Sequence, residues 1–314
     1  MDKYFSKLSM VISAFALLSM QTTAIKGQQS DVQIMILGIA QDAGYPQANC
    51  NRSCCRLFWN GEHEKRHVSS IGIIDRTQNE IYIIDATPDF TSQWQNIRSE
   101  LSSPPSKPTG IFLTHAHIGH YTGLMFLGRE AMGAKEVPVY AMPKMSEFLK
   151  TNGPWSQLVD LENITLTALN HNVTQQFTNF KITPFLVPHR DEFSETVGYT
   201  IEGNKKKVVF IPDINKWSEW DMDLKAVIED CDLALIDGSF YKNGELPGRD
   251  MKLIPHPFVE ETVALLSDLA PAHKTKVFFT HFNHTNPLLT SEKARWELLQ
   301  KGFNVALEGM KIDL

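Results

Sequence analysis

The sequence predicts an α/β fold in which strands and helices alternate along a single domain, residues 31–314. Two near-continuous apolar runs, residues 32–40 and 207–211, are typical of buried strands. Segments with helical periodicity, such as residues 90–101, lie between such runs. The third observation is a cluster of three histidines just after a short apolar run, residues 110–113. The length of 314 residues suits one α/β domain with a substantial core.

The first 24 residues have the three-part pattern of a secretory signal peptide. Lys3 and Lys7 form a basic start, residues 10–20 are an apolar run too short to span a bilayer comfortably, and residues 22–24 are small residues at cleavage-like positions. An uncleaved membrane anchor is the alternative, whereas the lack of a cysteine after the apolar run argues against a lipoprotein. We therefore expect an exported protein, periplasmic or secreted, without stable membrane insertion once residues 1–24 are removed.

The overall charge gives no reason to expect a polyanionic partner. The net charge of −6 and the isoelectric point near 6.0 favour neither nucleic acid nor an acidic membrane surface. We expect a small-molecule substrate instead. The sequence leaves a homodimer open.

The first strand leads into a loop that is followed by three of the four cysteines. Cys50, Cys54 and Cys55 lie close together, while Cys231 lies in an apolar segment that predicts core. Three thiolates with one further ligand suit a structural zinc, which prefers four sulfur or nitrogen ligands. Because export favours disulfides, a disulfide with one free thiol is an alternative, as are buried thiols without a metal.

A hairpin of two strands and then a helix are expected after the cysteines. Residues 69–74 and 80–85 predict a β-hairpin around the polar turn at residues 76–79. Residues 90–101 predict a helix, and the proline-rich residues 102–108 predict a rigid connector.

The three histidines have a spacing that suits metal binding. His115, His117 and His120 stand where a strand meets residues 121–132, which predict a helix. Neutral imidazole is the commonest transition-metal ligand near pH 7. Two imidazoles separated by one residue can converge on one ion, while the third faces a second ion. Three unrelated surface or core histidines are the alternative interpretation.

This stretch resembles the His-x-His-x-Asp-His signature of the metallo-β-lactamase superfamily. The resemblance implies a four-layer αββα sandwich and a metal centre. Gly119 stands where the superfamily has an aspartate that binds the second metal. Asp42, on the loop after the first strand, is our candidate replacement, and a single-metal enzyme is the alternative. The resemblance also implies that Asp85 helps to hold the metal loop.

The remaining strands end at residues that match further ligands of the superfamily. We expect helices from residue 143 and at residues 258–269, and strands at residues 138–142, 164–169, 180–187, 207–211, 233–236 and 276–280. The resemblance implies a first metal on His115, His117 and His189, and a second on His120, His281 and Asp213.

Two further residues follow these strand ends. Asp213 matches the carboxylate that bridges two metals, and a cap for a helix at Trp217 is its alternative role. His284 follows His281 on the same loop, and we expect it to point into the same cleft.

Five segments are similar to the family of coenzyme PQQ synthesis protein B. They comprise residues 38–50, 69–70, 85–89, 237–240 and 281–287. That branch and its phosphodiesterase relatives carry a structural zinc on a Cys-x-Cys-x-x-Cys motif, completed by a distant histidine.

This chain keeps only part of that cysteine motif. Cys50 and Cys55 match the outer positions, Arg52 stands at the middle position, and Cys54 is offered instead. The resemblance implies His256 as the fourth zinc ligand. The rivals nearer in sequence are His63 and His67.

Three neutral histidines around an ion with an open position are typical of catalytic zinc. Such an ion lowers the pKa of its bound water from about 15.7 to about 7 and supplies hydroxide. We expect a zinc hydrolase whose metal-bound hydroxide attacks an ester or phosphodiester, with Asp42, Asp213 and His284 as catalytic residues. Fe²⁺ or Mn²⁺ can also occupy such a site. The alternatives are an iron-dependent oxygenase connected with PQQ biosynthesis and a binding protein that has lost turnover.

Overall fold

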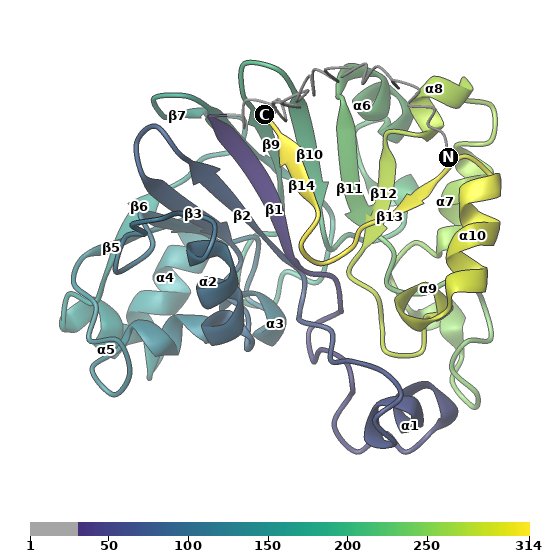
Figure 1. The fold of residues 1–314 in the computed structure, drawn as a ribbon, viewed down its shortest axis with the longest axis horizontal. Helices are drawn as coiled ribbons and strands as arrows, with labels where there is room; N and C mark the ends of the chain where they lie inside the picture. Colours follow the sequence, from purple (N-terminus) through teal and green to yellow (C-terminus); the bar gives the residue numbers. More distant parts are fainter. Residues whose placement is uncertain (1–30) are drawn as a thin grey trace, which may run out of the picture.

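The computed structural model describes residues 31–314, so the predicted signal peptide lies outside the described residues. Two seven-stranded sheets pack face to face, and helices cover their outer faces (Figure 1). This is the four-layer αββα sandwich that the sequence predicts. Within residues 31–314, none of the helices has the length and apolar character needed to span a membrane.

The first sheet has the strand order β14-β1-β2-β3-β4-β5-β6. Neighbours among β14, β1, β2 and β3 are antiparallel, and those from β3 to β6 are parallel. The predicted hairpin is confirmed as the β2–β3 pair. The strands are β1 Val32–Gly38, β2 Ser70–Asp75, β3 Glu80–Ile84, β4 Gly110–Phe112, β5 Val137–Ala141, β6 Ile164–Ala168 and β14 Lys311–Asp313.

The second sheet has the strand order β13-β12-β11-β10-β9-β8-β7. Neighbours from β7 to β10 are antiparallel, and those from β10 to β13 are parallel. The strands are β7 Gln175–Gln176, β8 Lys181–Leu186, β9 Val197–Glu202, β10 Lys207–Ile211, β11 Leu233–Asp237, β12 Val277–Thr280 and β13 Asn304–Val305.

The helices form the two outer layers, and α1 projects below the sandwich in Figure 1. On the side of the first sheet lie α2 Phe90–Arg98, α3 Ile118–Tyr121, α4 Pro143–Thr151 and α5 Trp155–Asp160. On the side of the second sheet lie α6 Leu224–Asp230, α7 Val259–Leu265, α8 Pro271–Lys274, α9 Pro287–Thr290 and α10 Glu292–Gln300. The projecting helix is α1 Ser53–Trp59, and the 3₁₀ helices are η1 Thr122–Leu127, η2 Trp217–Glu219 and η3 Met251–Leu253.

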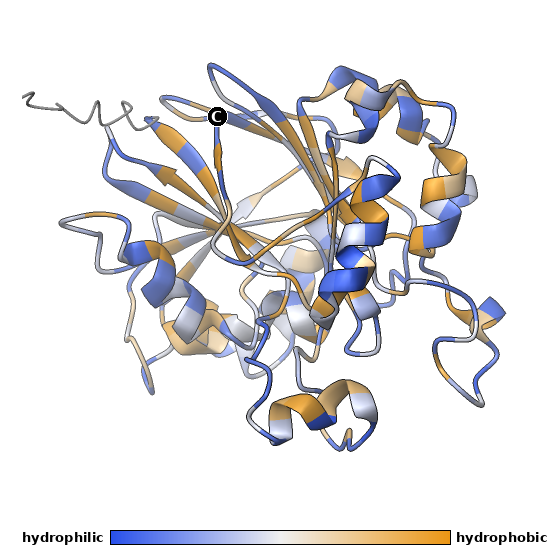
Figure 2. Ribbon diagram, turned by 45° about the vertical axis from the view of Figure 1, so that its right-hand side comes forward, coloured by the Kyte–Doolittle hydropathy of each residue, from blue (hydrophilic) through white to orange (hydrophobic). Residues whose placement is uncertain are grey.

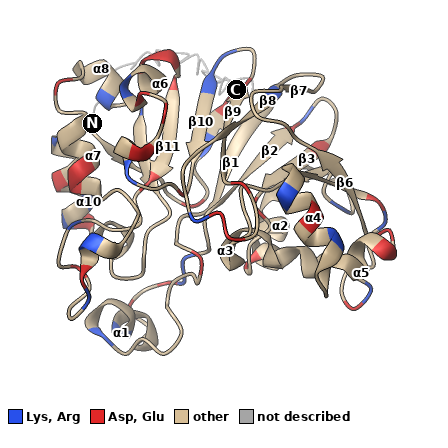
Figure 3. Cartoon of the chain, turned by 180° about the vertical axis from the view of Figure 1, so that it is seen from behind, with Lys and Arg blue, Asp and Glu red and all other residues tan. Residues whose placement is uncertain are grey.

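Strand β1 shows why its sequence is a continuous apolar run. Ile34 and Ile36 belong to the core between the sheets, whereas Met35 and Leu37 belong to the core under the outer helices. Successive side chains of a strand point to opposite faces, so a strand covered on both faces needs apolar residues throughout. Figure 2 shows the resulting concentration of apolar residues on the strands, and Figure 3 shows that charged residues lie mainly on helices and loops.

The helix predicted over residues 121–132 is wrong. The chain forms the short α3 and then the 3₁₀ helix η1. A Cβ on Gly123 would lie only 2.1 Å from the carbonyl oxygen of Thr87, so this segment packs directly against the backbone of the neighbouring loop. Tertiary packing therefore overrides the local helical pattern.

Candidate metal centre

The polar side chains of the centre follow the ends of strands from both sheets. His115 and His117 come after β4, His120 lies in α3, Asp213 comes after β10 and His281 comes directly after β12. Backbone in the left-handed region (φ 62°) turns the chain at His281. A non-glycine residue in this region indicates a position that the surrounding structure imposes, as is common at functional sites.

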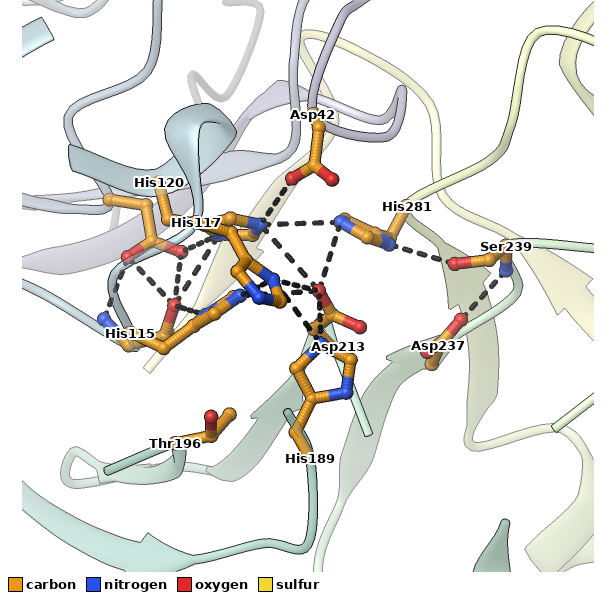
Figure 4. A network of polar contacts seen from close by, with 12 residues as sticks. Asp42, His115, His117, His120, His189, Thr196, Asp213, Asp237, Ser239 and His281 are labelled. Atoms are coloured by element: carbon orange, nitrogen blue, oxygen red, sulfur yellow. Dashed lines mark hydrogen bonds and ion pairs between the residues drawn. The ribbon is translucent and has the colours of Figure 1, made fainter. Parts of the chain in front are cut away.

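The first group consists of His115, His117, His189 and Asp213, whose ligand atoms lie within 4.8 Å of one another. The Nε2 atoms of His115 and His189 are each 3.3 Å from Oδ2 of Asp213. Figure 4 shows the three imidazoles pointing toward this carboxylate. The structure thus brings together the three histidines predicted for the first metal.

The second group consists of Asp42, His120, Asp213 and His281, with ligand atoms again within 4.8 Å. Oδ1 of Asp42 is 3.2 Å from Nε2 of His120, which is 3.3 Å from Nε2 of His281. Asp213 belongs to both groups, because its Oδ2 is also 3.9 Å and 3.8 Å from these two Nε2 atoms. This is the position predicted for a bridging carboxylate.

Asp42 occupies the space that a side chain at position 119 would need. A Cβ built on Gly119 would lie 2.4 Å from Cα of Asp42 and 2.6 Å from its Oδ1. The carboxylate that the signature carries within the motif is therefore delivered here by the loop after β1. Glycine at position 119 is what allows this loop to approach.

Polar partners hold the ring nitrogens that face away from the centre. Nδ1 of His120 is 2.7 Å from Oδ2 of Asp85, which also accepts a hydrogen bond from the hydroxyl of Thr114. Nδ1 of His281 is 2.9 Å from Oγ of Ser239, and Nδ1 of His189 is 3.2 Å from Oδ1 of Asn215. Such contacts orient metal-binding imidazoles and fix their tautomers. Asp85 has the supporting position that the sequence predicts.

The electrostatics of the centre favour bound cations. Burial holds the pKa of His115 well below its ordinary value, so this imidazole is neutral, as a metal ligand must be. Burial also disfavours charge on His120, but Asp85 and Asp42 outweigh it and raise the pKa of His120. For Asp42, burial would raise the pKa, but His120 outweighs it and keeps the carboxyl ionised. Buried carboxylates of this kind require positive charge beside them.

The donor set fits a pair of divalent ions. Both oxygens of Asp213 and Oδ1 of Asp42 are buried and have no hydrogen-bond partner, although imidazole nitrogens lie close to them. Buried carboxylate oxygens are normally hydrogen-bonded, and exceptions of this kind indicate a functional group or an ion. Five imidazoles and two carboxylates converge on two adjacent points.

A second possible metal site lies beside helix α1. Cys50, Cys54, Cys55 and His284 have ligand atoms within 4.8 Å of one another. Nδ1 of His284 is buried without a hydrogen-bond partner. All four cysteines of the chain are free, including the distant Cys231, so the structure contains no disulfide among the described residues. This donor set fits a closed structural zinc site.

A family model for the beta-lactamase superfamily domain matches residues 81–282. The chain belongs to this superfamily. Its relatives include coenzyme PQQ synthesis protein B of Methylorubrum extorquens, 27% identical over 90% of this chain and 100% of the relative. The same protein of Methylobacillus flagellatus is 28% identical over 90% of this chain and 100% of that protein.

Solved structures agree with this membership. Zn²⁺-bound PqqB from Methylobacterium extorquens has a TM-score of 0.74 and 25% identity, covering 90% of this chain and 100% of that one. A diphosphatase of the PhnP family has a TM-score of 0.62 and 21% identity, covering 90% and 96%, and shows the shared fold.

Two histidines of this superfamily member have positions other than those predicted. The prediction of His256 as the fourth ligand of the cysteine cluster is wrong, because His256 is buried at the metal centre, 2.8 Å from Asp237 and 3.1 Å from Asp213. His284, predicted to be catalytic and to point into the cleft of the centre, lies with the cysteines and also lines the cavity beside the centre. The rivals join neither group, since His63 lies beside the hydroxyl of Tyr45 and His67 pairs with Glu308.

The path of the chain explains this exchange. The loop between β11 and α7 returns across the centre and brings His256 to Asp213. His284 lies three residues after His281, on a loop that runs from the centre toward α1. The two imidazoles belong to different groups of possible metal ligands, although His284 also lines the cavity beside the centre.

Proposed function

We propose that the protein is an exported, metal-dependent hydrolase acting on an ester or phosphodiester bond of a small-molecule substrate. The single observation that carries this proposal is the position of Asp213. Its two buried oxygens have no hydrogen-bond partner and lie between two groups of metal-ligating side chains. A carboxylate shared by two ions is the arrangement of two-metal hydrolytic sites.

Each group would hold one ion. His115, His117 and His189 would bind the first, and His120, His281 and Asp42 the second, with Asp213 shared. Divalent ions held there would supply a coordinated water of lowered pKa and would polarise the carbonyl or phosphoryl group of the substrate. We propose zinc, because neutral imidazoles are its typical ligands, and a further structural zinc on Cys50, Cys54, Cys55 and His284. The Zn²⁺-bound structure of PqqB, a relative, supports this choice.

The protein's own groups complete the site. Nδ1 of His256 is 2.8 Å from Oδ2 of Asp237, which leaves Nε2 for a group in the cavity that this ring lines. Asp85 and Ser239 keep His120 and His281 turned toward the centre. Preorganised groups of this kind bind and orient the substrate without rearrangement during the reaction.

Similarity to coenzyme PQQ synthesis protein B over 90% of the chain favours a second candidate function. This is an iron-dependent oxidoreductase connected with PQQ biosynthesis. Three histidines at the first group favour zinc over the two histidines and one carboxylate typical of Fe²⁺ oxygenases.

Metal content and hydrolysis together test the proposal. We expect about three zinc ions per chain in the purified protein, falling to about two in a Cys54→Ser, Cys55→Ser variant. The metal-loaded protein should release nitrophenolate from bis(4-nitrophenyl) phosphate or 4-nitrophenyl acetate, and His115→Ala should abolish the release. Iron retained in the cysteine variant, with oxygen consumption and no hydrolysis, would favour the oxidoreductase. Absence of metal beyond the cysteine-dependent ion would refute both functions.

Export is tested by cell fractionation. The mature protein should be recovered from the periplasm or medium with its N-terminus near residue 25. A full-length chain in the cytoplasm would contradict export without affecting the hydrolase proposal.

A further inference from the structure

A cavity of about 420 Å³ adjoins the metal centre. Asp42 and His256 line it on the side of the centre, and Arg190 and Arg249 contribute the basic groups. Its volume is within the range of small-molecule pockets, about 300–1,000 Å³. Arg190 directly follows the metal-ligating His189, and Arg249 lies on the loop between β11 and α7.

The charge of this cavity is opposite to that of the chain. The whole sequence has a net charge of −6, yet two arginines line the cavity, and Asp42, its one acidic lining residue, is committed to the metal centre. Neither guanidinium forms a hydrogen bond or salt bridge through its side chain with another described residue. The positive charge of Arg190 is one of the causes that lower the pKa of the neighbouring Glu192. Both arginines are exposed, so their charges lie at the solvent-facing part of the cavity.

Amide groups add neutral donors to the same wall. Oε1 of Gln41 accepts a hydrogen bond from Nδ2 of Asn283 at 2.7 Å, which leaves the amide nitrogen of Gln41 available as a donor. Gln41, Gln47 and Asn283 all line the cavity. The wall thus combines guanidinium and amide donors, the groups that bind carboxylate and phosphate oxygens.

We propose that the substrate carries an anionic group, phosphate or carboxylate, that binds in this cavity to Arg190 and Arg249 while the scissile bond lies at the metal centre. This inference rests on the proposed hydrolase function and specifies its substrate class. A guanidinium matches both oxyanions with paired hydrogen bonds, which gives orientation as well as affinity. The acidic chain would otherwise repel such a substrate.

Binding of simple anions tests the cavity without requiring turnover. Isothermal titration would compare inorganic phosphate and succinate on the metal-loaded wild type, Arg190→Ala, Arg249→Ala and the double variant. We expect each single substitution to lower the affinity for one of the two anions by about tenfold, which is the effect of losing a charge-assisted hydrogen bond. The anion that loses more affinity identifies the substrate's group as phosphate or carboxylate. The matched control is Arg129→Ala, which removes an exposed arginine paired with Glu130 outside the cavity.

Turnover provides the second measurement. Arg249→Ala should raise the KM for 4-nitrophenyl hemisuccinate or for a nitrophenyl phosphodiester with a further phosphate by about tenfold. The KM for the neutral 4-nitrophenyl butyrate should rise less than the KM for the anionic ester, and Arg249→Lys should recover part of the loss.

The two proposals can fail separately. An unchanged affinity for anions in the double variant would show that anions bind only at the metal ions. This result would overturn the assignment of the cavity. A wild type that binds anions through the arginines but hydrolyses none of these esters would overturn the hydrolase function and leave the anion site standing.

Discussion

Replacing Gly119 by alanine tests whether the loop after β1 has taken over a metal ligand of the superfamily. The new Cβ would lie 2.4 Å from Cα of Asp42, whereas carbon atoms in contact are separated by about 3.5 Å or more. The backbone at Asp42 must therefore retreat by about 1 Å. Oδ1, now 3.2 Å from Nε2 of His120, would move away with it and bind an ion shared with that ring less well. Overpacking of this kind costs about 1–3 kcal/mol of stability.

The assay is element-resolved metal content beside thermal unfolding. We expect Gly119→Ala to lose one zinc ion per chain and to unfold at a lower temperature. Asp42→Ala removes the carboxylate without the clash, so it should lose the same ion with little loss of stability beyond that of the ion itself. Gly153→Ala is the control for the glycine substitution, since a Cβ there meets no atom within 4 Å. Wild-type metal content and stability in Gly119→Ala would refute the reasoning.

Three further predictions concern other parts of the chain. His284→Ala should lose one zinc ion, as measured by metal analysis, whereas Cys231→Ser should lose none because this buried thiol lies outside the cysteine cluster. Glu308 raises the pKa of His67 in the folded protein. The stabilisation by this pair is therefore full below the pKa of the unfolded state, about 6.5, and is lost as the pH rises through the raised pKa of the folded state. Thermal unfolding should therefore show Glu308→Gln destabilising most near pH 5.5 and least near about pH 9, and a constant difference would contradict the pairing. Gln93→Leu should lower the free energy of unfolding in urea by about 1–3 kcal/mol, because the buried Gln93 amide donates to the carbonyl of Val68 at 2.7 Å, and a loss below about 0.5 kcal/mol would contradict this role.

The sequence allowed correct prediction of the features that depend on local pattern. The apolar run of β1 reflects a strand covered on both faces, and the spacing of His115, His117 and His120 reflects a strand that ends beside a short helix. The resemblance to the superfamily, applied at the end of a predicted strand, placed Asp213 between the two groups. Strand ends are predictable because alternation and turn residues mark them locally.

The assignments of His256 and His284 depended instead on the course of loops. Each is a single histidine in a segment without regular periodicity. The neighbouring sequence does not indicate which cluster its imidazole approaches. The buried Nδ1 of His284 and the contacts of His256 with two carboxylates become visible only in three dimensions. Gly119 in place of the aspartate could be read from the sequence alone. That Asp42 occupies the space of the missing side chain is visible only from the close approach of the two residues in the structure.

Pairing of β14 with β1 has a consequence for the order in which the molecule can be completed during synthesis. Gln33 of β1 donates a hydrogen bond to Asp313 across 280 residues of sequence. A ribosome must therefore release Lys311–Asp313 before one flank of β1 acquires its neighbour. Until then the nascent chain presents an open strand edge, the kind of surface that attracts other chains. A binding factor that shields such edges would protect the chain between the synthesis of β1 and that of β14.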